Sequence, residues 1–309
     1  MKKKFFKRVI SETVIVLLCF GMSSCQKEEE QKKQNESPAS PPEIYGFDAN
    51  GASYAFFSVS PNKQVRFSRG NMQYQASTDT WRFAQHQYDC IGAENEKIAS
   101  DYTGWIDLFG WGTSGWEGSG AVCYQPYSVS TEFKDYYIGG HADKELLTDK
   151  YAEADWAWHN AISNGGNKKH MWRVLTKEEW IYLLEERTDA EKKYAHAKVN
   201  DVKGLVILPD SLLDTTSLVL NTDYYGHNVL TKEQWLRIEK TGAVFLPVTG
   251  RRFGSKVTEI VDRGTYWSVT GLYNGFAWSF DFLDNYIGTR VSGGSERLRG
   301  FSVRPVQDI

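Results

Sequence analysis

Hydrophobic and polar residues alternate in several short stretches of the first third of the chain. Phe57 and Val59 alternate with serines, and Val65 and Phe67 follow the same period of two. Alternation of this kind places every second side chain on one face of a strand. The polar and glycine-containing residues at 68–71 interrupt the pattern and predict a turn. We therefore expect short strands at 57–59, 65–67, 72–74 and 80–83.

Two short helices are predicted from nearly identical start signals. The chain reads L-T-K-E-E-W over 175–180 and L-T-K-E-Q-W over 230–235. In each segment the threonine caps free backbone N–H groups of the first turn, and the Glu or Gln three residues later bonds back, which is the capping-box arrangement. Apolar residues then recur on one face of each helix. They are Trp180, Leu183 and Leu184 in the first helix, and Trp235 and Ile238 in the second.

Strand-like patterns return after residue 242. Runs rich in aromatic and β-branched residues cover 243–246, 265–268, 276–280 and 300–304. A Gly- and Trp-rich segment over 104–120 has no period, and we expect it to be irregular. Strands followed by two short helices and then by more strands predict an α+β fold with a loop-rich mixed sheet, rather than a doubly wound sheet.

Composition and charge narrow the class of protein. The 309 residues are 41% hydrophobic and 24% charged, which is typical of a globular protein. The formal net charge is −3, and the chain from Cys25 onward carries 31 basic and 38 acidic residues. A nucleic-acid binder needs clustered positive charge, so we expect no nucleic-acid partner.

The N-terminus has the layout of a secretory signal. Four lysines and one arginine precede an apolar run over 14–20, which is too short to span a bilayer as a helix. The M-S-S-C sequence over 22–25 then resembles a bacterial lipobox. The resemblance implies that 1–24 is a lipoprotein signal peptide and that the Cys25 thiol is lipidated and anchors the protein to a membrane. The alternative is an ordinary secretory signal with an unrelated cysteine.

Residues 25–42 are expected to form a flexible tether. The charged run over 26–30 resembles the surface-export signal of outer-membrane lipoproteins in the Bacteroidota, and a proline-rich stretch over 37–42 ends the segment. A stretch with so few apolar residues cannot offset the entropy lost on ordering. The resemblance implies an outer-membrane lipoprotein exposed at the cell surface, with 43–309 as a single ectodomain.

Several motifs between 155 and 306 resemble known protein families. The segment over 172–180 reads W-R-V-L-T-K-E-E-W and is similar to the W-R-L-P-T-x-x-E-W helix start of formylglycine-generating-enzyme-like proteins, although Leu175 stands where proline is common. Y-W-S-V-T over 266–270 and G-F-S-V-R over 300–304 resemble the Fibrobacter succinogenes major paralogous domain. Both families are similar to C-type lectins in fold, so the resemblance implies a C-type-lectin-like ectodomain.

The resemblance does not bring the oxidase activity with it. Formylglycine-generating enzymes bind copper through a pair of C-terminal cysteines, whereas the last cysteine of this chain is Cys123. The chain has no H-E-x-x-H zinc motif, no G-x-S-x-G nucleophile elbow and no phosphate-binding P-loop. His159 lies near an acid and two indoles, and it is either a structural histidine or a catalytic one. A hydrolase whose site leaves no motif stays open.

Cysteine and metal chemistry offer few candidates. Cys90 and Cys123 are the two thiols of the ectodomain, and in an exported protein they either pair as a disulfide or stay free. The Leu-Pro-Asp sequence at 208–210 lacks the Trp-Asn-Asp strand of calcium-dependent lectins. No cofactor is expected, although Asp281 or Asp284 would suit a structural calcium ion in an irregular loop.

Five aromatic residues in and just after the irregular segment are candidates for ligand contact. Indole and phenol rings offer large contact areas at small entropy cost, so they suit sugar surfaces and protein partners. They equally suit a core beneath long loops. The candidates are Trp105, Trp111, Trp116, Tyr124 and Tyr127.

Taken together, these patterns predict a binding protein without catalysis. We expect a lipid-anchored cell-surface ectodomain that recognises a glycan, a peptide or a protein of the cell envelope. One alternative is an envelope hydrolase, which needs a cleft with converging carboxylates or histidines. The other is a structural subunit of a surface complex, which needs an exposed apolar patch or an open strand edge.

Overall fold

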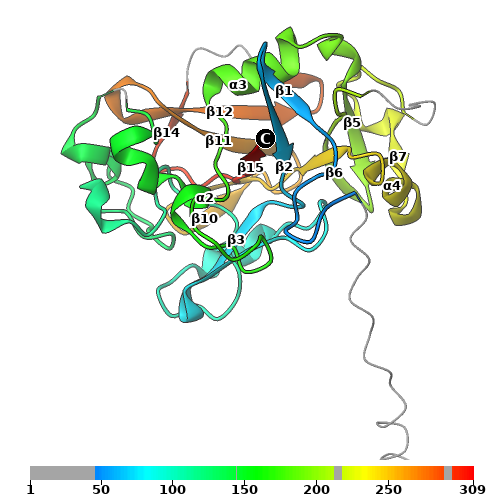
Figure 1. Cartoon of the computed structure of the whole chain (residues 1–309). Helices are drawn as coiled ribbons and strands as arrows, with labels where there is room; N and C mark the ends of the chain where they lie inside the picture. The colour runs from blue at the N-terminus through cyan, green and yellow to red at the C-terminus, as the bar shows by residue number, and fades with distance from the viewer. Residues whose placement is uncertain (1–45, 144, 212–217, 289–293) are drawn as a thin grey trace, which may run out of the picture. The chain divides into compact units, whose positions relative to one another are not determined.

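The alternating stretches form strands in the computed structural model (Figure 1), which describes residues 46–143, 145–211, 218–288 and 294–309. All four strands expected in the first third are present, and so are three of the four expected after residue 242. The signal peptide, Cys25 and the tether lie outside the described residues.

Helices in the described residues are short. They are α2 (Trp156–His159), α3 (Lys177–Ile181), which continues as a π-helical turn over Tyr182–Glu186, and α4 (Lys232–Glu239). None of the helices described is long and apolar enough to cross a membrane.

Strands and short 3₁₀ helices make up the rest of the regular structure, and the mixture of helices and strands places the protein in the α+β class. The strands are β1 (Phe57–Ser60), β2 (Lys63–Phe67), β3 (Met72–Gln75), β4 (Thr80–Phe83), β5 (Tyr194–Val199), β6 (Val202–Ile207), β7 (Val229–Leu230), β8 (Val244–Pro247), β9 (Arg251–Phe253), β10 (Lys256–Thr258), β11 (Arg263–Gly271), β12 (Phe276–Leu283), β13 (Tyr286–Gly288), β14 (Ser295–Glu296) and β15 (Val306–Asp308).

The strands are distributed over several small sheets. β1, β2 and β15 form one antiparallel sheet, so the last strand of the chain pairs with the second. A second sheet has the order β7-β5-β6-β8, in which only β7 and β5 run parallel. β11 and β12 form a long antiparallel hairpin (Figure 1), extended by β13 and β14. β3 pairs with β4, and β9 pairs with β10.

Both predicted capping boxes are confirmed. The Thr176 hydroxyl accepts a hydrogen bond from the Glu179 N–H at 3.2 Å, and the Glu179 carboxylate accepts one from the Thr176 N–H at 3.0 Å. Thr231 and Gln234 repeat the arrangement at 3.3 Å and 2.7 Å. The apolar faces predicted for the two helices are buried, as the positions of Trp180, Leu183, Leu184, Trp235 and Ile238 show.

Several elements lack a counterpart in the sequence-based expectation, among them a short helix and a long hairpin. A third short helix, α2, begins after Asp155, whose side chain caps it. The β5–β6 hairpin turns at Asn200 and Asp201, which have φ angles of 47° and 66°. Residues of this type tolerate the left-handed region that a two-residue hairpin turn requires, so Val-Asn-Asp-Val at 199–202 was a usable signal for this hairpin.

The strand predicted at 300–304 is wrong. Gly300 bridges Arg252, Phe301 bridges Phe109, and Ser302 bridges Tyr266, so consecutive residues bond to different segments rather than to one strand. The regular strand at this end of the chain is β15, which begins later. The irregularity predicted for 104–120 is confirmed, since only a 3₁₀ turn over Glu117–Ser119 interrupts it.

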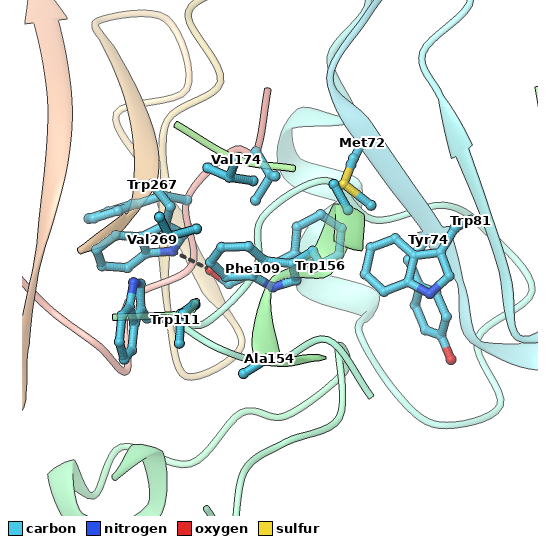
Figure 2. Packing of buried hydrophobic residues seen from close by; sticks show 14 of the residues in the cluster. Met72, Tyr74, Trp81, Phe109, Trp111, Ala154, Trp156, Val174, Trp267 and Val269 are labelled. Carbon is cyan, nitrogen blue, oxygen red and sulfur yellow. Dashed lines mark hydrogen bonds between the residues drawn. The ribbon is translucent and has the colours of Figure 1, made fainter. Parts of the chain in front are cut away.

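Two hydrophobic cores meet at the β11–β12 hairpin. The first core contains Trp81, Phe109, Trp111, Trp156 and Trp267 (Figure 2), and the Trp267 indole donates a hydrogen bond to the Phe109 carbonyl at 2.7 Å. The second core includes the following buried rings: Trp180, Tyr266, Trp278, Phe280 and Phe282. β11 serves both cores because its successive side chains point to opposite faces.

Three fully buried arginines donate hydrogen bonds to backbone carbonyls, most of which lie outside the strands. Arg252 and Arg304 donate hydrogen bonds to the carbonyls of Leu108 and Phe245, each at 3.3 Å. Arg297 reaches three carbonyls that lie far apart in the sequence: Phe276 at 3.0 Å, Asp143 at 2.7 Å and Leu272 at 3.1 Å. Buried carbonyls without a partner are costly, so these guanidinium groups take the place of a ladder.

Replacing Arg297 with Met tests this role. The variant leaves the Asp143 and Leu272 carbonyls without this donor, while the Phe276 carbonyl keeps its bond from the Leu272 N–H. At about 1–3 kcal/mol per group, we expect the free energy of unfolding to fall by at least about 2 kcal/mol. Urea denaturation at pH 7 measures the change. Arg299→Met is the matched control, because that side chain is 30% exposed and pairs with Glu296. Equal losses in the two variants would contradict the argument.

Candidate functional site

An open cleft of about 540 Å³ lies beside the segment that resembles the formylglycine-generating-enzyme-like helix start. We call it the Trp158 cleft. Its apolar wall includes Leu147, Val174 and Val269 in addition to the Trp158 indole. Its polar lining includes Asp149, Glu153, Asp155, His170 and Arg173.

Asp155 positions the residues of α2 within this cleft. One oxygen of its carboxylate accepts a hydrogen bond from the Ala157 N–H at 2.9 Å, which caps the helix, and the other accepts from the Val174 N–H at 2.8 Å. The same side chain therefore joins α2 to the 172–176 segment. Burial raises the pKa of the Asp155 carboxyl to about 6, although these N–H groups and Arg173 oppose the shift.

Glu153, in the lining of the cleft, bonds to two histidines, of which His170 also lines the cleft. Its two oxygens lie 2.6 Å from Nδ1 of His159 and 2.7 Å from Nε2 of His170. Burial acts to raise the pKa of the Glu153 carboxyl, but the hydrogen bonds from both imidazoles outweigh it and hold this pKa below its ordinary value. The His170 ring also packs on Trp158, with ring centroids 4.8 Å apart.

The positive charge of Arg173 is neutralised by carboxylates of other segments. Its guanidinium donates to Glu179 at 2.6 Å and 2.8 Å and to Asp308 at 2.7 Å. Lys63 joins the same group at 3.1 Å from Glu179. Because Arg173 is matched in this way and Glu153 is bonded to the two histidines, the carboxylates of Asp149 and Asp155 give the cleft its excess of negative charge at neutral pH.

The sequence pointed to only part of this cleft. His159 was singled out because of its neighbours, and it pairs with Glu153 rather than standing alone. Glu153 and His170 are separated by 17 residues and carry no motif, so only the fold brings them together. Arg173 lies in the W-R-V-L-T segment and was visible as part of a helix start, not as part of a cleft.

The five aromatic candidates do not form one surface. Trp111 is fully buried, its indole donates to the Ser268 carbonyl at 2.9 Å, and the Arg297 guanidinium lies 4.4 Å from its ring centre. The expectation that Trp111 contacts a ligand is therefore wrong, because Trp111 is a core residue. Trp116 and Tyr127 are partly buried and pack against the first core.

The remaining two candidates keep some exposed area. Trp105 is half-buried beneath the guanidinium of Arg82, which lies 3.6 Å from its ring centre. Tyr124 is also half-buried. Neither residue lines the Trp158 cleft.

Cys90 and Cys123 are both free thiols in the structure. Burial raises the pKa of the Cys90 thiol to about 12, and Asp107 and Asp89 add to the shift. Cys123 is buried beside Tyr136 and Leu298. At neutral pH Cys90 is therefore a protonated, unreactive thiol.

Two of the three sequence positions considered for calcium are already paired with arginines. Asp210, in the Leu-Pro-Asp segment, pairs with Arg187 at 3.2 Å and accepts from Ser58 at 2.7 Å. Asp281 pairs with Arg263 at 2.7 Å, while Asp284 is exposed. Among the described residues there is no group of three or more His, Cys, Asp and Glu side chains that is placed to hold a metal ion.

Comparison with known proteins returned no match: no protein family, no curated protein and no solved structure is similar enough to this chain to be assigned. The likeness to formylglycine-generating-enzyme-like proteins and to the Fibrobacter succinogenes domain therefore rests on the motif residues alone.

Trp111 and Trp116 can be separated by their effect on stability. Removing a fully buried indole costs about 3–5 kcal/mol, so we expect Trp111→Ala to lower the free energy of unfolding by that amount. Trp116→Ala, which removes a partly exposed ring, should cost clearly less. Chemical denaturation followed by circular dichroism measures both. If Trp111→Ala is no more destabilised than Trp116→Ala, the placement of Trp111 in the core is wrong.

Proposed function

We propose that this protein is a lipid-anchored cell-surface ectodomain that binds a basic peptide segment of an envelope protein in the Trp158 cleft. The observation that carries the proposal is the combination in one cleft of an indole, an apolar wall and an excess of carboxylates. These are the groups that a Lys or Arg side chain needs.

A Lys or Arg side chain has a long aliphatic stem and a charged head. Val174 and Val269 offer apolar surface for the stem, and Asp149, an exposed residue of the lining, offers a carboxylate for the head. A cation over the face of the Trp158 indole gains about 0.5–2 kcal/mol more. A glycan would use the indole but would gain little from the unbalanced negative charge.

A hydrolase is the competing function, because Glu153, in the lining of the cleft, bonds to two histidines. Asp155 has the raised pKa that an acid catalyst needs. Both oxygens of Asp155, however, already accept backbone N–H groups that cap α2 and fix the 172–176 segment. This supports a structural carboxylate, and with it binding rather than catalysis.

The proposal also includes a C-type-lectin-like fold and a membrane anchor at Cys25. A C-type-lectin-like fold is supported by the two capped short helices and by the Y-W-S-V-T segment in β11. Attachment through Cys25 to the outer membrane, with the ectodomain at the cell surface, is supported by the lipobox and by the charged run that follows it.

Binding is tested with the full chain purified in detergent. Isothermal titration with a peptide rich in Lys and Arg should give a measurable affinity, and a peptide of equal length rich in Glu should not bind. Trp158→Ala should weaken binding by about ten-fold through loss of the cation–π contact. Trp105→Ala is the matched control, since that half-buried indole lies outside the cleft.

The affinity for the basic peptide should depend on pH because of the Asp155 carboxyl. Its carboxyl takes up a proton as the pH falls through about 6, so the cleft loses a negative charge and affinity for the basic peptide should drop between pH 7 and pH 5.

Equal affinity for the acidic peptide, or an equal effect of the two Trp variants, would contradict the proposal. Cleavage of the bound peptide, followed by mass spectrometry, would support the hydrolase instead.

The anchor is tested separately by metabolic labelling with a radioactive fatty acid. The wild-type protein should incorporate the label and partition with membranes, because a diacylated Cys25 holds the chain there. Cys25→Ala should lose both properties, and Cys19→Ala, which lies inside the signal peptide, should keep them. Labelling of the Cys25→Ala protein would rule out this cysteine as the attachment site.

A further inference from the structure

A second pocket, of about 480 Å³, lies on one face of the β11–β12 hairpin. Thr265 of β11 pairs with Asp281 of β12, and both line the pocket. The residues next to them, Tyr266, Phe280 and Phe282, point to the opposite face and are buried in the second core. At this end of the hairpin, therefore, one face is apolar and the other is polar, whereas further along β11 both faces are buried. We call the polar hollow the β11–β12 pocket.

Charged groups at this pocket neutralise one another. Arg263 pairs with Asp281 at 2.7 Å and with Glu259 at 3.0 Å. Arg251 pairs with the same Glu259 at 2.5 Å. Glu259 does not line the pocket but pairs with both arginines, so with Asp281 the group of two guanidiniums and two carboxylates has no net charge, in contrast to the Trp158 cleft. Neither an anion nor a cation is favoured by the charges of this group, so the pocket suits a neutral ligand.

A buried hydroxyl in the pocket lacks a partner. Thr265 is only 2% exposed, and in the described part of the chain its Oγ1 has no hydrogen-bond partner. A buried polar group without a partner destabilises the folded protein unless something supplies the bond. The Ser279 and Ser295 hydroxyls lie 2.9 Å apart, and since each hydroxyl has one proton and two lone pairs, this pair retains capacity for a further bond.

The lining matches the chemistry of sugar hydroxyls. Each sugar hydroxyl both donates and accepts, and the pocket offers an acceptor in Asp281, a donor in Arg263 and groups of both kinds in Thr265 and Ser279. The Tyr286 side chain, 36% exposed, adds an aromatic ring at the rim, and such rings pack on the C–H face of a sugar. We propose that the β11–β12 pocket binds a neutral saccharide unit through direct hydrogen bonds.

The proposal is tested by isothermal titration of the full chain in detergent with glucose, galactose, mannose and N-acetylglucosamine. Glucuronic acid and glucosamine are the charged comparisons. We expect one of the neutral sugars to bind at least ten-fold more tightly than both charged sugars, and equally well with EDTA present. No binding by any neutral sugar, tighter binding of a charged one, or loss of binding in EDTA would each overturn the proposal.

Thr265→Val separates the site from the fold. The change keeps the shape of the side chain and removes the hydroxyl, so sugar affinity should fall at least ten-fold while the thermal midpoint of the free protein stays the same or rises. Thr103→Val, at an exposed position away from the pocket, should change neither. Unchanged affinity in Thr265→Val would overturn the proposal. A lowered midpoint would do the same, because it would mean that the hydroxyl is already bonded in the free protein.

Binding of the saccharide and binding of the peptide are expected to be independent of each other. Thr265→Val should leave affinity for the basic peptide unchanged, and Trp158→Ala should leave affinity for the sugar unchanged, because the two pockets share no lining residue. A loss of both activities in either variant would mean that the two pockets do not act as separate sites, and it would overturn the assignment made here.

Discussion

The structure depends on supplying hydrogen bonds to backbone that lies inside the protein without belonging to a helix or sheet. Segments such as 104–120 and 297–304 run between hydrophobic cores, where water is absent and an unpaired carbonyl is costly. Arg252 and Arg297 meet this need at Leu108, Asp143 and Leu272, because a guanidinium carries five N–H donors and reaches several carbonyls at once. The aromatic excess has the same origin, since large rings fill the volume beneath long loops.

The same constraint shapes the Trp158 cleft. Asp155 is buried because it must accept the N–H groups of Ala157 and Val174, which belong to two segments without a common ladder. Its position directs α2 so that Trp158 borders the cleft, while Trp156, two residues earlier, is buried in the first core. Asp155 thus accepts hydrogen bonds from buried backbone N–H groups and also adds negative charge to the cleft. This is why the cleft is acidic although Arg173 lines it.

The two pockets differ in charge for a structural reason. The charged residues of the Trp158 cleft come from a helix start and a loop. The Arg173 guanidinium bonds to Glu179 and Asp308, which do not line the cleft. The charged residues of the β11–β12 pocket include Arg263 and Asp281, which lie on paired strands and neutralise each other across the hairpin. We therefore propose a basic peptide for the first pocket and a neutral sugar for the second.

Sequence by itself determined the features whose signals act over a few residues. The capping boxes at Thr176 and Thr231 and the short alternating strands β1 to β4 appeared where expected, because capping and alternation are local. Tertiary structure alone decided which aromatic rings are buried, since nothing in the sequence separates Trp111 from Trp158. It also decided that 300–304 is not a strand, and it joined Glu153 to His170, because these partners come from distant segments and leave no pattern along the chain.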